Sequence, residues 1–118
     1  MIYKQEDIKK QQIQDYNFLV GMYEDDYFPN HIVDMGKNLL IKLCLDIEKQ
    51  QPKTLDTLYN LTHETTERFN DLEAIFYEND SEIETMAREC IAEDFEKIAL
   101  NYGFKDADIE ELIEPREW

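Results

Sequence analysis

Residues 29–50 read PNHIVDMGKNLLIKLCLDIEKQ, and this stretch decides the fold. Its apolar or small residues recur three and four positions apart, which is the spacing of one face of an α-helix; they are Ile32, Gly36, Leu39, Leu40, Leu43 and Ile47. Ile41, Cys44 and Leu45 widen that face until it covers most of the helix. Such a helix is typical of the centre of a bundle. We therefore expect one long central helix, which ends at Gln51-Pro52-Lys53.

The sequence that follows predicts two more long helices. One begins after Thr54, a good N-cap residue, and ends near Asn79-Asp80. The other opens with Ser81 and Glu84, spaced as an S-x-x-E capping box, and ends before Gly103. We expect short helices at about 15–24 and 108–114, and a polar arm or frayed helix over residues 1–14. The predicted fold is all-α: an antiparallel bundle of three long helices capped by one or two short helices, in a single domain over residues 15–118.

Charge limits the partners that this chain can bind. It has 28 Asp and Glu residues against 12 Lys and Arg, a net charge of −16. Residues 1–53 carry a net charge of −2, and residues 54–118 one of −14. Binding to nucleic acid or to an anionic membrane is disfavoured, because both need clustered Lys and Arg. A basic protein or divalent cations would be attracted, although high net charge also simply keeps a protein in solution.

The expected compartment is the cytoplasm. No apolar segment of a signal peptide follows Met1, and no apolar run reaches the roughly 20 residues of a membrane span. Cys44 and Cys90 are expected to be free thiols, as in a reducing compartment. The sequence leaves open a monomer or a homodimer, and the homodimer would pair through the broad apolar surface of residues 29–50.

Asp94 is the first candidate site residue. Since the turn between the second and third long helices is centred near Asp80, Thr66 is expected level with Asp94. Helical phase puts Asp94 inside an apolar stripe, and Thr62, Thr65 and Thr66 on the inner side of the preceding helix. A carboxylate there must be hydrogen-bonded, paired or protonated. We expect Asp94 to be buried and to accept hydrogen bonds from these threonines or from a tyrosine hydroxyl, either as a structural network or as part of a ligand or metal pocket.

Two sets of carboxylates are weak candidates for a divalent metal site. Glu64, Glu67 and Asp71 share one face of the second long helix, and Glu89 and Glu93 share a face of the third. Helical nucleotide pyrophosphohydrolases hold metal with E-x-x-E on one helix and E-x-x-D on the next. Glu64 and Glu67 match the first half, whereas Glu89 and Glu93, four apart, do not match the second. The first set also falls opposite the apolar stripe, where charged residues are usually just solvated.

Aromatic residues beside acidic ones form a candidate interaction surface. Tyr23, Tyr27 and Phe28 flank Asp25 and Asp26, and Trp118 lies at the other end of the sequence. Aromatic side chains of this kind anchor protein partners. They can equally cap the open end of a helical bundle.

Several stretches resemble a bacterial family catalogued as a domain of unknown function, DUF5713. They are Tyr27-Phe28-Pro29, residues 61–72 (LTHETTERFNDL), residues 81–85 (SEIET), residues 87–95 (ARECIAEDF), Tyr102-Gly103-Phe104, residues 109–113 (IEELI) and the ending Arg116-Glu117-Trp118. The resemblance extends from about Tyr16 to the end of the chain, and it implies no activity, cofactor or catalytic residue.

Three functions remain open at this point. The favoured one is a small acidic, non-enzymatic protein that binds a basic protein, as an immunity protein or inhibitor does. No catalytic triad or Gly-rich phosphate loop is present, so neither an enzyme nor a cofactor is indicated. The alternatives are a metal-dependent hydrolase of nucleotide-like substrates, which uses the helix carboxylates, and a structural module that dimerises.

Overall fold

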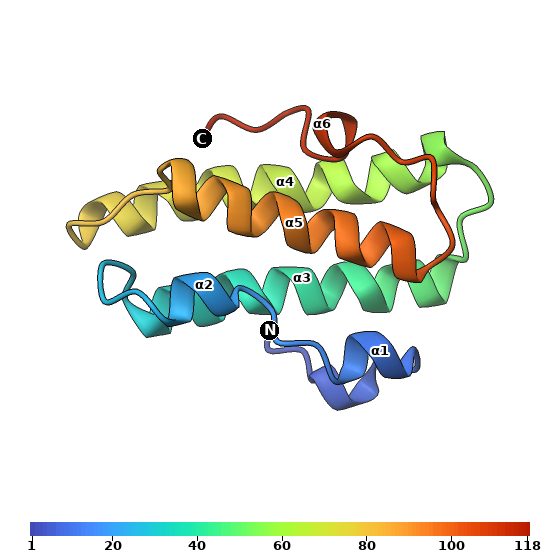
Figure 1. Cartoon of the computed structure of the whole chain (residues 1–118), viewed down its shortest axis with the longest axis horizontal. Coiled ribbons are helices and arrows are strands. Elements are labelled where there is room, and N and C mark those ends of the chain that lie inside the picture. Colours follow the sequence, from blue (N-terminus) through green and yellow to red (C-terminus); the bar gives the residue numbers. More distant parts are fainter.

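The computed structural model describes residues 1–118, and its regular structure is entirely helical. Three long helices, α3 (Asn30–Gln50), α4 (Leu55–Glu78) and α5 (Thr85–Asn101), run back and forth and pack side by side (Figure 1). The short helices are η1 (Gln5–Asp7), α1 (Gln11–Gln14), α2 (Val20–Tyr23) and α6 (Ile109–Leu112). The predicted all-α bundle of three long helices is confirmed. None of the helices combines the length and apolar composition that a bilayer crossing requires.

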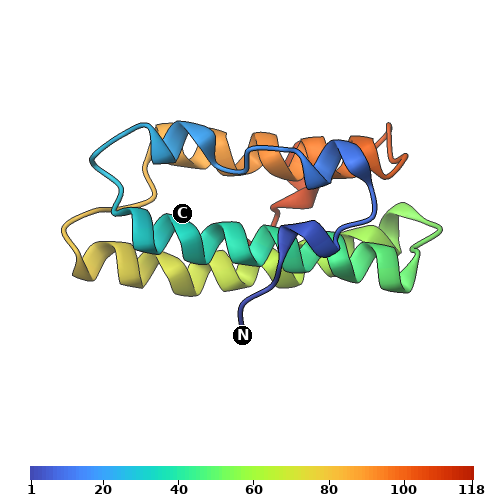
Figure 2. The same cartoon turned by 90° about the horizontal axis from the view of Figure 1, so that it is seen from below.

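The central role of α3 follows from its apolar surface, most of which is buried. Leu40 and Cys44 are 0% exposed, and the other buried residues of the helix are Ile32, Val33, Gly36, Ile41, Leu43 and Ile47. The N-terminal segment packs onto the core, since α1 and α2 contact α5 and α2 also contacts α3 (Figure 2). Within residues 1–14, expected as an arm or frayed helix, Ile8 and Ile13 are both fully buried.

The short helix expected over about residues 15–24 is only partly present. α1 ends before Asp15, and α2 starts at Val20, after Leu19 adopts a left-handed backbone with φ of 55°. The backbone N–H of Leu19 donates to the carboxylate of Asp94, and so does the hydroxyl of Tyr16. The chain therefore leaves the helical path where it wraps around a buried carboxylate, which no local signal reveals.

The capping box predicted at Ser81 and Glu84 is wrong. Ser81 instead completes the end of α4: its N–H donates to the carbonyl of Phe76 at 2.9 Å, and Asp80 takes a left-handed backbone with φ of 60°. This is a Schellman motif, with Asp80 in the position that glycine usually occupies. Because Ser81 is used by α4, α5 begins later, at Thr85, and Glu84 becomes its N-cap by accepting from the N–H of Ala87.

The other predicted helix ends agree with the structure to within a residue or two. Thr54 caps α4 by accepting from the N–H of Thr57 at 3.2 Å, and α3 ends at Gln50. At the end of α5, Gly103 has φ of 92°, and the N–H of Phe104 donates to the carbonyl of Ala99. The last helix is shorter than the expected 108–114, because α6 ends at Leu112.

Candidate functional site

Asp94 is buried, as predicted, and it is the only buried carboxylate of the chain. Its side chain lies on α5 and the residue is 3% exposed. One carboxylate oxygen accepts from the hydroxyl of Tyr16 at 2.6 Å, and the other accepts from the N–H of Leu19 at 2.7 Å. Burial raises the pKa of Asp94 to about 6, although these two hydrogen bonds favour the charged form. The tyrosine donor is therefore confirmed.

The predicted threonine network is wrong. Thr62 and Thr66 are buried and Thr65 is half-buried, but none of their hydroxyls donates to Asp94. Each donates to a backbone carbonyl one turn earlier in α4: Thr62 to Tyr59, Thr65 to Leu61 and Thr66 to Thr62. The hydroxyl of Thr66 also reaches the carbonyl of Leu112 in α6. Asp94 faces the N-terminal segment instead of α4. Its role in the structure is to tie residues 16–19 to α5.

The weak metal candidates do not form a site. Glu64, Glu67 and Asp71 on α4 and Glu89 and Glu93 on α5 are all exposed. No group of three or more His, Cys, Asp or Glu side chains in the chain could hold a metal ion. The only ion pair among these residues joins Asp71 to Arg68, at 3.5 Å. The converging carboxylates that the hydrolase alternative requires are therefore not found in the structure.

Two members of the predicted aromatic surface are buried and cannot be contact residues. Phe28 is 2% exposed and packs against Phe76, with ring centroids 6.1 Å apart. Trp118 is 4% exposed and packs against Phe69, with ring centroids 6.2 Å apart. Of the remaining members, Tyr23 is half-buried, whereas Asp25, Asp26 and Tyr27 are exposed. Aromatic residues near a loop or at an end of the sequence thus complete the core here.

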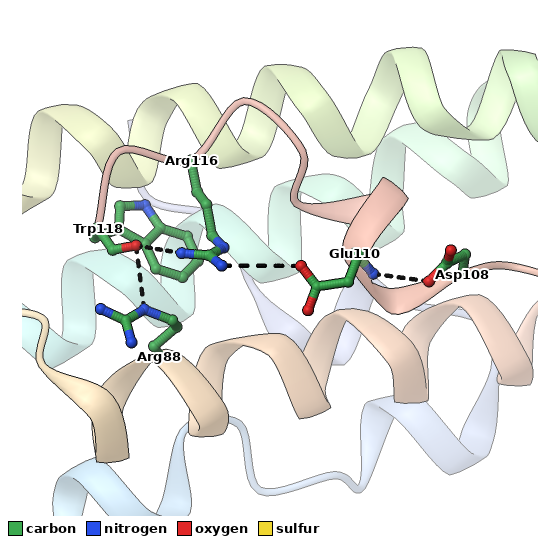
Figure 3. Close-up of polar contacts among 5 residues, drawn as sticks. All are labelled: Arg88, Asp108, Glu110, Arg116 and Trp118. Atoms are coloured by element: carbon green, nitrogen blue, oxygen red, sulfur yellow. Dashed lines mark hydrogen bonds and ion pairs between the residues drawn. The ribbon is translucent and has the colours of Figure 1, made fainter.

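Two arginines fasten the C-terminal segment across the bundle (Figure 3). Arg88 on α5 and Arg116 both donate to the carbonyl oxygen of Trp118, at 3.1 and 2.6 Å. Arg116 also lies over the indole ring, 5.8 Å from its centroid, and 3.8 Å from the carboxylate of Glu110. Asp108 caps α6 through the N–H of Glu110. These contacts use both arginines for structure, so the shallow cleft of about 240 Å³ between them has little free positive charge.

The exposed members of the predicted surface belong to a larger feature, which we call the acidic end. It lies where the loop between α2 and α3 meets the turn between α4 and α5, at the same end of the bundle in both views (Figures 1 and 2). Its exposed residues are Glu24, Asp25, Asp26, Tyr27, Tyr77, Glu78, Asp80 and Glu82. Tyr27 and Tyr77 are 43% and 73% exposed. Sequence reasoning missed Tyr77, which directly follows the buried Phe76.

The acidic end has no counter-charge of its own. Residues 11–36 contain five Asp or Glu and residues 69–87 contain six, and neither stretch contains Lys or Arg. None of the exposed carboxylates of the acidic end forms an ion pair. Desolvation and the charges of Glu82 and Glu84 raise the pKa of Tyr27. Burial and the charges of Glu82 and Glu117 also raise the pKa of Glu73, one turn before Tyr77, and the charge of Arg88 offsets only part of this effect. Negative potential is therefore concentrated around the exposed tyrosines.

Comparison with protein families agrees with the resemblance noted in the sequence. The model of a family of unknown function matches residues 12–118, which is most of the chain. The chain belongs to DUF5713. All exposed residues of the acidic end and all three long helices lie within the DUF5713 match, whereas η1 precedes it. Comparisons with curated proteins and with solved structures found no match. Membership in DUF5713 therefore assigns residues 12–118 to one family without indicating an activity.

Proposed function

We propose that this chain is a small acidic, non-enzymatic interaction protein that binds a basic protein partner through the acidic end. The observation that supports this proposal most directly is the pair of exposed tyrosines, Tyr27 and Tyr77, among carboxylates that have no Lys or Arg nearby in the sequence. Tyrosine supplies rigid contact area with a polar tip. Carboxylates supply attraction for Lys and Arg on the partner and repel acidic proteins.

Charge would act on the rate of encounter as well as on the strength of the complex. A net charge of −16 attracts a basic protein over a distance set by ionic strength, about 8 Å at physiological salt. Such steering raises association rates by orders of magnitude at low salt. The complex should therefore form more slowly as salt is added, with a smaller effect on dissociation. An immunity protein or inhibitor that neutralises a basic protein is one function that this behaviour would serve.

The two alternative functions have less support. The hydrolase needs converging carboxylates, and none of the candidate sets forms a metal-holding group. Dimerisation was expected to use the broad apolar surface of α3, but most of that surface is already covered within the chain. Its more exposed apolar residues are Met35, at 43%, and the half-buried Leu39 and Leu45. We propose a monomer in a bacterial cytoplasm, which is compatible with the free thiols of Cys44 and Cys90.

The test compares two sets of substitutions that remove the same amount of negative charge. The first neutralises five carboxylates of the acidic end: Asp25→Asn, Asp26→Asn, Glu78→Gln, Asp80→Asn and Glu82→Gln. Asn is chosen at position 80 because it tolerates the left-handed backbone there. The control neutralises five exposed carboxylates elsewhere: Glu64→Gln, Glu67→Gln, Glu89→Gln, Glu93→Gln and Glu96→Gln. The control set also removes all but one of the weak metal candidates.

The immobilised wild type would capture partners from a bacterial lysate, and the affinity of each identified protein would then be measured by calorimetry. Exposed charge pairs contribute roughly 0.5 kcal/mol each, so the first variant should bind a basic partner more than about tenfold more weakly. The control should change affinity less than about threefold at equal ionic strength. Equal weakening of both variants, or a partner without net positive charge, would contradict the proposal.

A further inference from the structure

A second surface of the molecule has the opposite character to the acidic end. It is a cleft of about 830 Å³ between residues 7–10, the last turn of α3 with residues 51–53, and Tyr102 and Phe104 after α5. Since α3 joins the loop at the acidic end to the loop beside this cleft, the two surfaces lie at opposite ends of the bundle (Figures 1 and 2). Its volume is within the usual range for sites that take a small molecule.

Four lysines line this cleft. They are Lys9, Lys10, Lys49 and Lys53, a third of the 12 basic residues in a chain that has 28 acidic ones. All four are exposed, and none forms an ion pair. Only two carboxylates, Asp7 and Glu48, lie in the lining. Four ammonium groups around one space repel one another unless an anion is present, so the arrangement favours a ligand with several negative charges.

Glu48 holds the walls of the cleft together. Its carboxylate accepts from the backbone N–H groups of Lys9 and Lys10, at 2.9 and 3.0 Å, and from the hydroxyl of Tyr102, at 2.6 Å. Burial opposes ionisation of Glu48, but these hydrogen bonds outweigh it and lower its pKa. One carboxylate thus fixes the N-terminal segment, α3 and the end of α5 relative to one another. The lysine ammonium groups are left free for a ligand.

The cleft also has an apolar side. Phe104 and Pro52 are half-buried members of the lining. The position of Phe104 is set by the end of α5, where the N–H of Phe104 donates to Ala99 at 2.9 Å and the N–H of Gly103 donates to Leu100 at 3.1 Å. This pair of bonds is a Schellman motif and requires the positive φ of Gly103. The aromatic ring is therefore carried by a rigid turn.

We propose that this cleft binds a small organic anion that carries at least two negative charges and a flat or apolar portion. The four lysines neutralise the anionic groups, and Phe104 and Pro52 pack against the rest of the molecule. Phosphate and carboxylate groups share this chemistry, since Lys binds either as a point charge. Glu48 is a positioning residue, because its carboxylate holds the lysine-bearing segments in place through hydrogen bonds and does not itself bind the anion. The site is separate from the acidic end and does not depend on the proposed partner.

The experiment titrates the whole chain with ADP, pyrophosphate and citrate at constant ionic strength, followed by calorimetry and by backbone amide NMR. ADP tests phosphate with a ring, pyrophosphate tests phosphate alone, and citrate tests carboxylate. The test variant is Lys49→Gln with Lys53→Gln, and the control, Lys37→Gln with Lys97→Gln, makes the same charge change outside the cleft. Phe104→Ala tests the apolar side, and circular dichroism checks that every variant is folded.

We expect at least one probe to bind saturably with a Kd below about 1 mM, and the Lys49 and Lys53 variant to bind it at least about tenfold more weakly than the control. Phe104→Ala should weaken ADP more than pyrophosphate. Stronger binding of pyrophosphate than citrate would assign phosphate as the preferred anion, and the reverse would assign carboxylate. The proposal is overturned if no probe binds saturably, or if the test and control lysine variants bind the probe with the same affinity. It is also overturned if the NMR signals of the cleft shift only with protein concentration, since the acidic end of a second copy would then occupy the cleft.

Discussion

Replacing Asp94 with Asn removes the only buried carboxylate and keeps the size of its side chain. Burial raises the pKa of Asp94 from an ordinary 3.8 to about 6, and the hydrogen bonds from Tyr16 and Leu19 offset only part of this effect. Between pH 3.8 and pH 6 the native protein therefore binds more protons than the unfolded chain. The contribution of this group to stability grows as pH falls through that window and is lost as pH rises through it. The difference between the two pKa values corresponds to roughly 3 kcal/mol.

The assay is urea unfolding of the wild type and Asp94→Asn at a series of pH values between about 4 and 8. Acidification also weakens repulsion among the many surface carboxylates, but that effect is common to both proteins. Only the difference between their free energies of unfolding reports Asp94. As pH rises from 4 to 7, we expect the free energy of unfolding of the wild type to fall by roughly 2 kcal/mol relative to that of the variant.

The result can fail in two informative ways. A difference that stays constant with pH would mean that Asp94 titrates alike in the folded and unfolded chains, as a hydrated side chain would. If the free energy of unfolding of the wild type instead rises relative to that of the variant as pH rises, the hydrogen bonds from Tyr16 and Leu19 outweigh burial. They then hold the pKa of Asp94 below its ordinary value. Carbon NMR of the Asp94 carboxyl group would separate these cases, because it follows the protonation of that residue directly.

Three further substitutions test the packing and the backbone. Gly36→Ala should lower the free energy of unfolding by roughly 1–3 kcal/mol, because the new Cβ would lie 3.1 Å from a ring carbon of Phe69. Gly21→Ala is the control: its Cβ would meet only ordinary contacts, so this variant should be as stable as the wild type or more stable in the same urea unfolding experiment. Trp118→Ala should cost roughly 3 kcal/mol of unfolding free energy, and a loss below roughly 1 kcal/mol would show that the C-terminal segment adds little to the core. Gln51→Gly should raise the thermal midpoint by relieving a left-handed backbone with φ of 48°, worth roughly 1 kcal/mol, and an unchanged midpoint would argue against strain there.

The long helices could be predicted because each carries its own signal. The periodicity of residues 29–50 and the N-cap at Thr54 are local, and they place α3 and the start of α4 correctly. Two predictions about the helices fail, each where a distant or competing contact decides the local structure. The helix expected at 15–24 is interrupted because Leu19 bonds to Asp94, 75 residues away. The capping box fails because the N–H of Ser81 is already bonded to Phe76.

The candidate site was harder to predict, since exposure depends on tertiary packing. Helical phase was enough to bury Asp94, but it could not identify Tyr16 as the donor, 78 residues earlier in the chain. The sequence leaves open whether Phe28 and Trp118 anchor a partner at the surface or cap the open end of the bundle. Each fills a gap between helices, next to Phe76 and Phe69 respectively. A large aromatic side chain near a turn is thus ambiguous until the packing around it is known.

The distribution of charge in space differs from its distribution along the sequence, because the chain reverses direction between helices. Divided along the sequence, negative charge belongs to residues 54–118, which carry −14 of the total. In space the division is different, because antiparallel helices bring residues 24–27 and 77–82 to one end and residues 7–10, 49–53 and 102–104 to the other. Each end draws on both halves of the sequence. The molecule is therefore polar along its long axis, with carboxylates and tyrosines at one end and four unpaired lysines at the other. A single net charge cannot represent that polarity, and one partner is not expected to satisfy both ends.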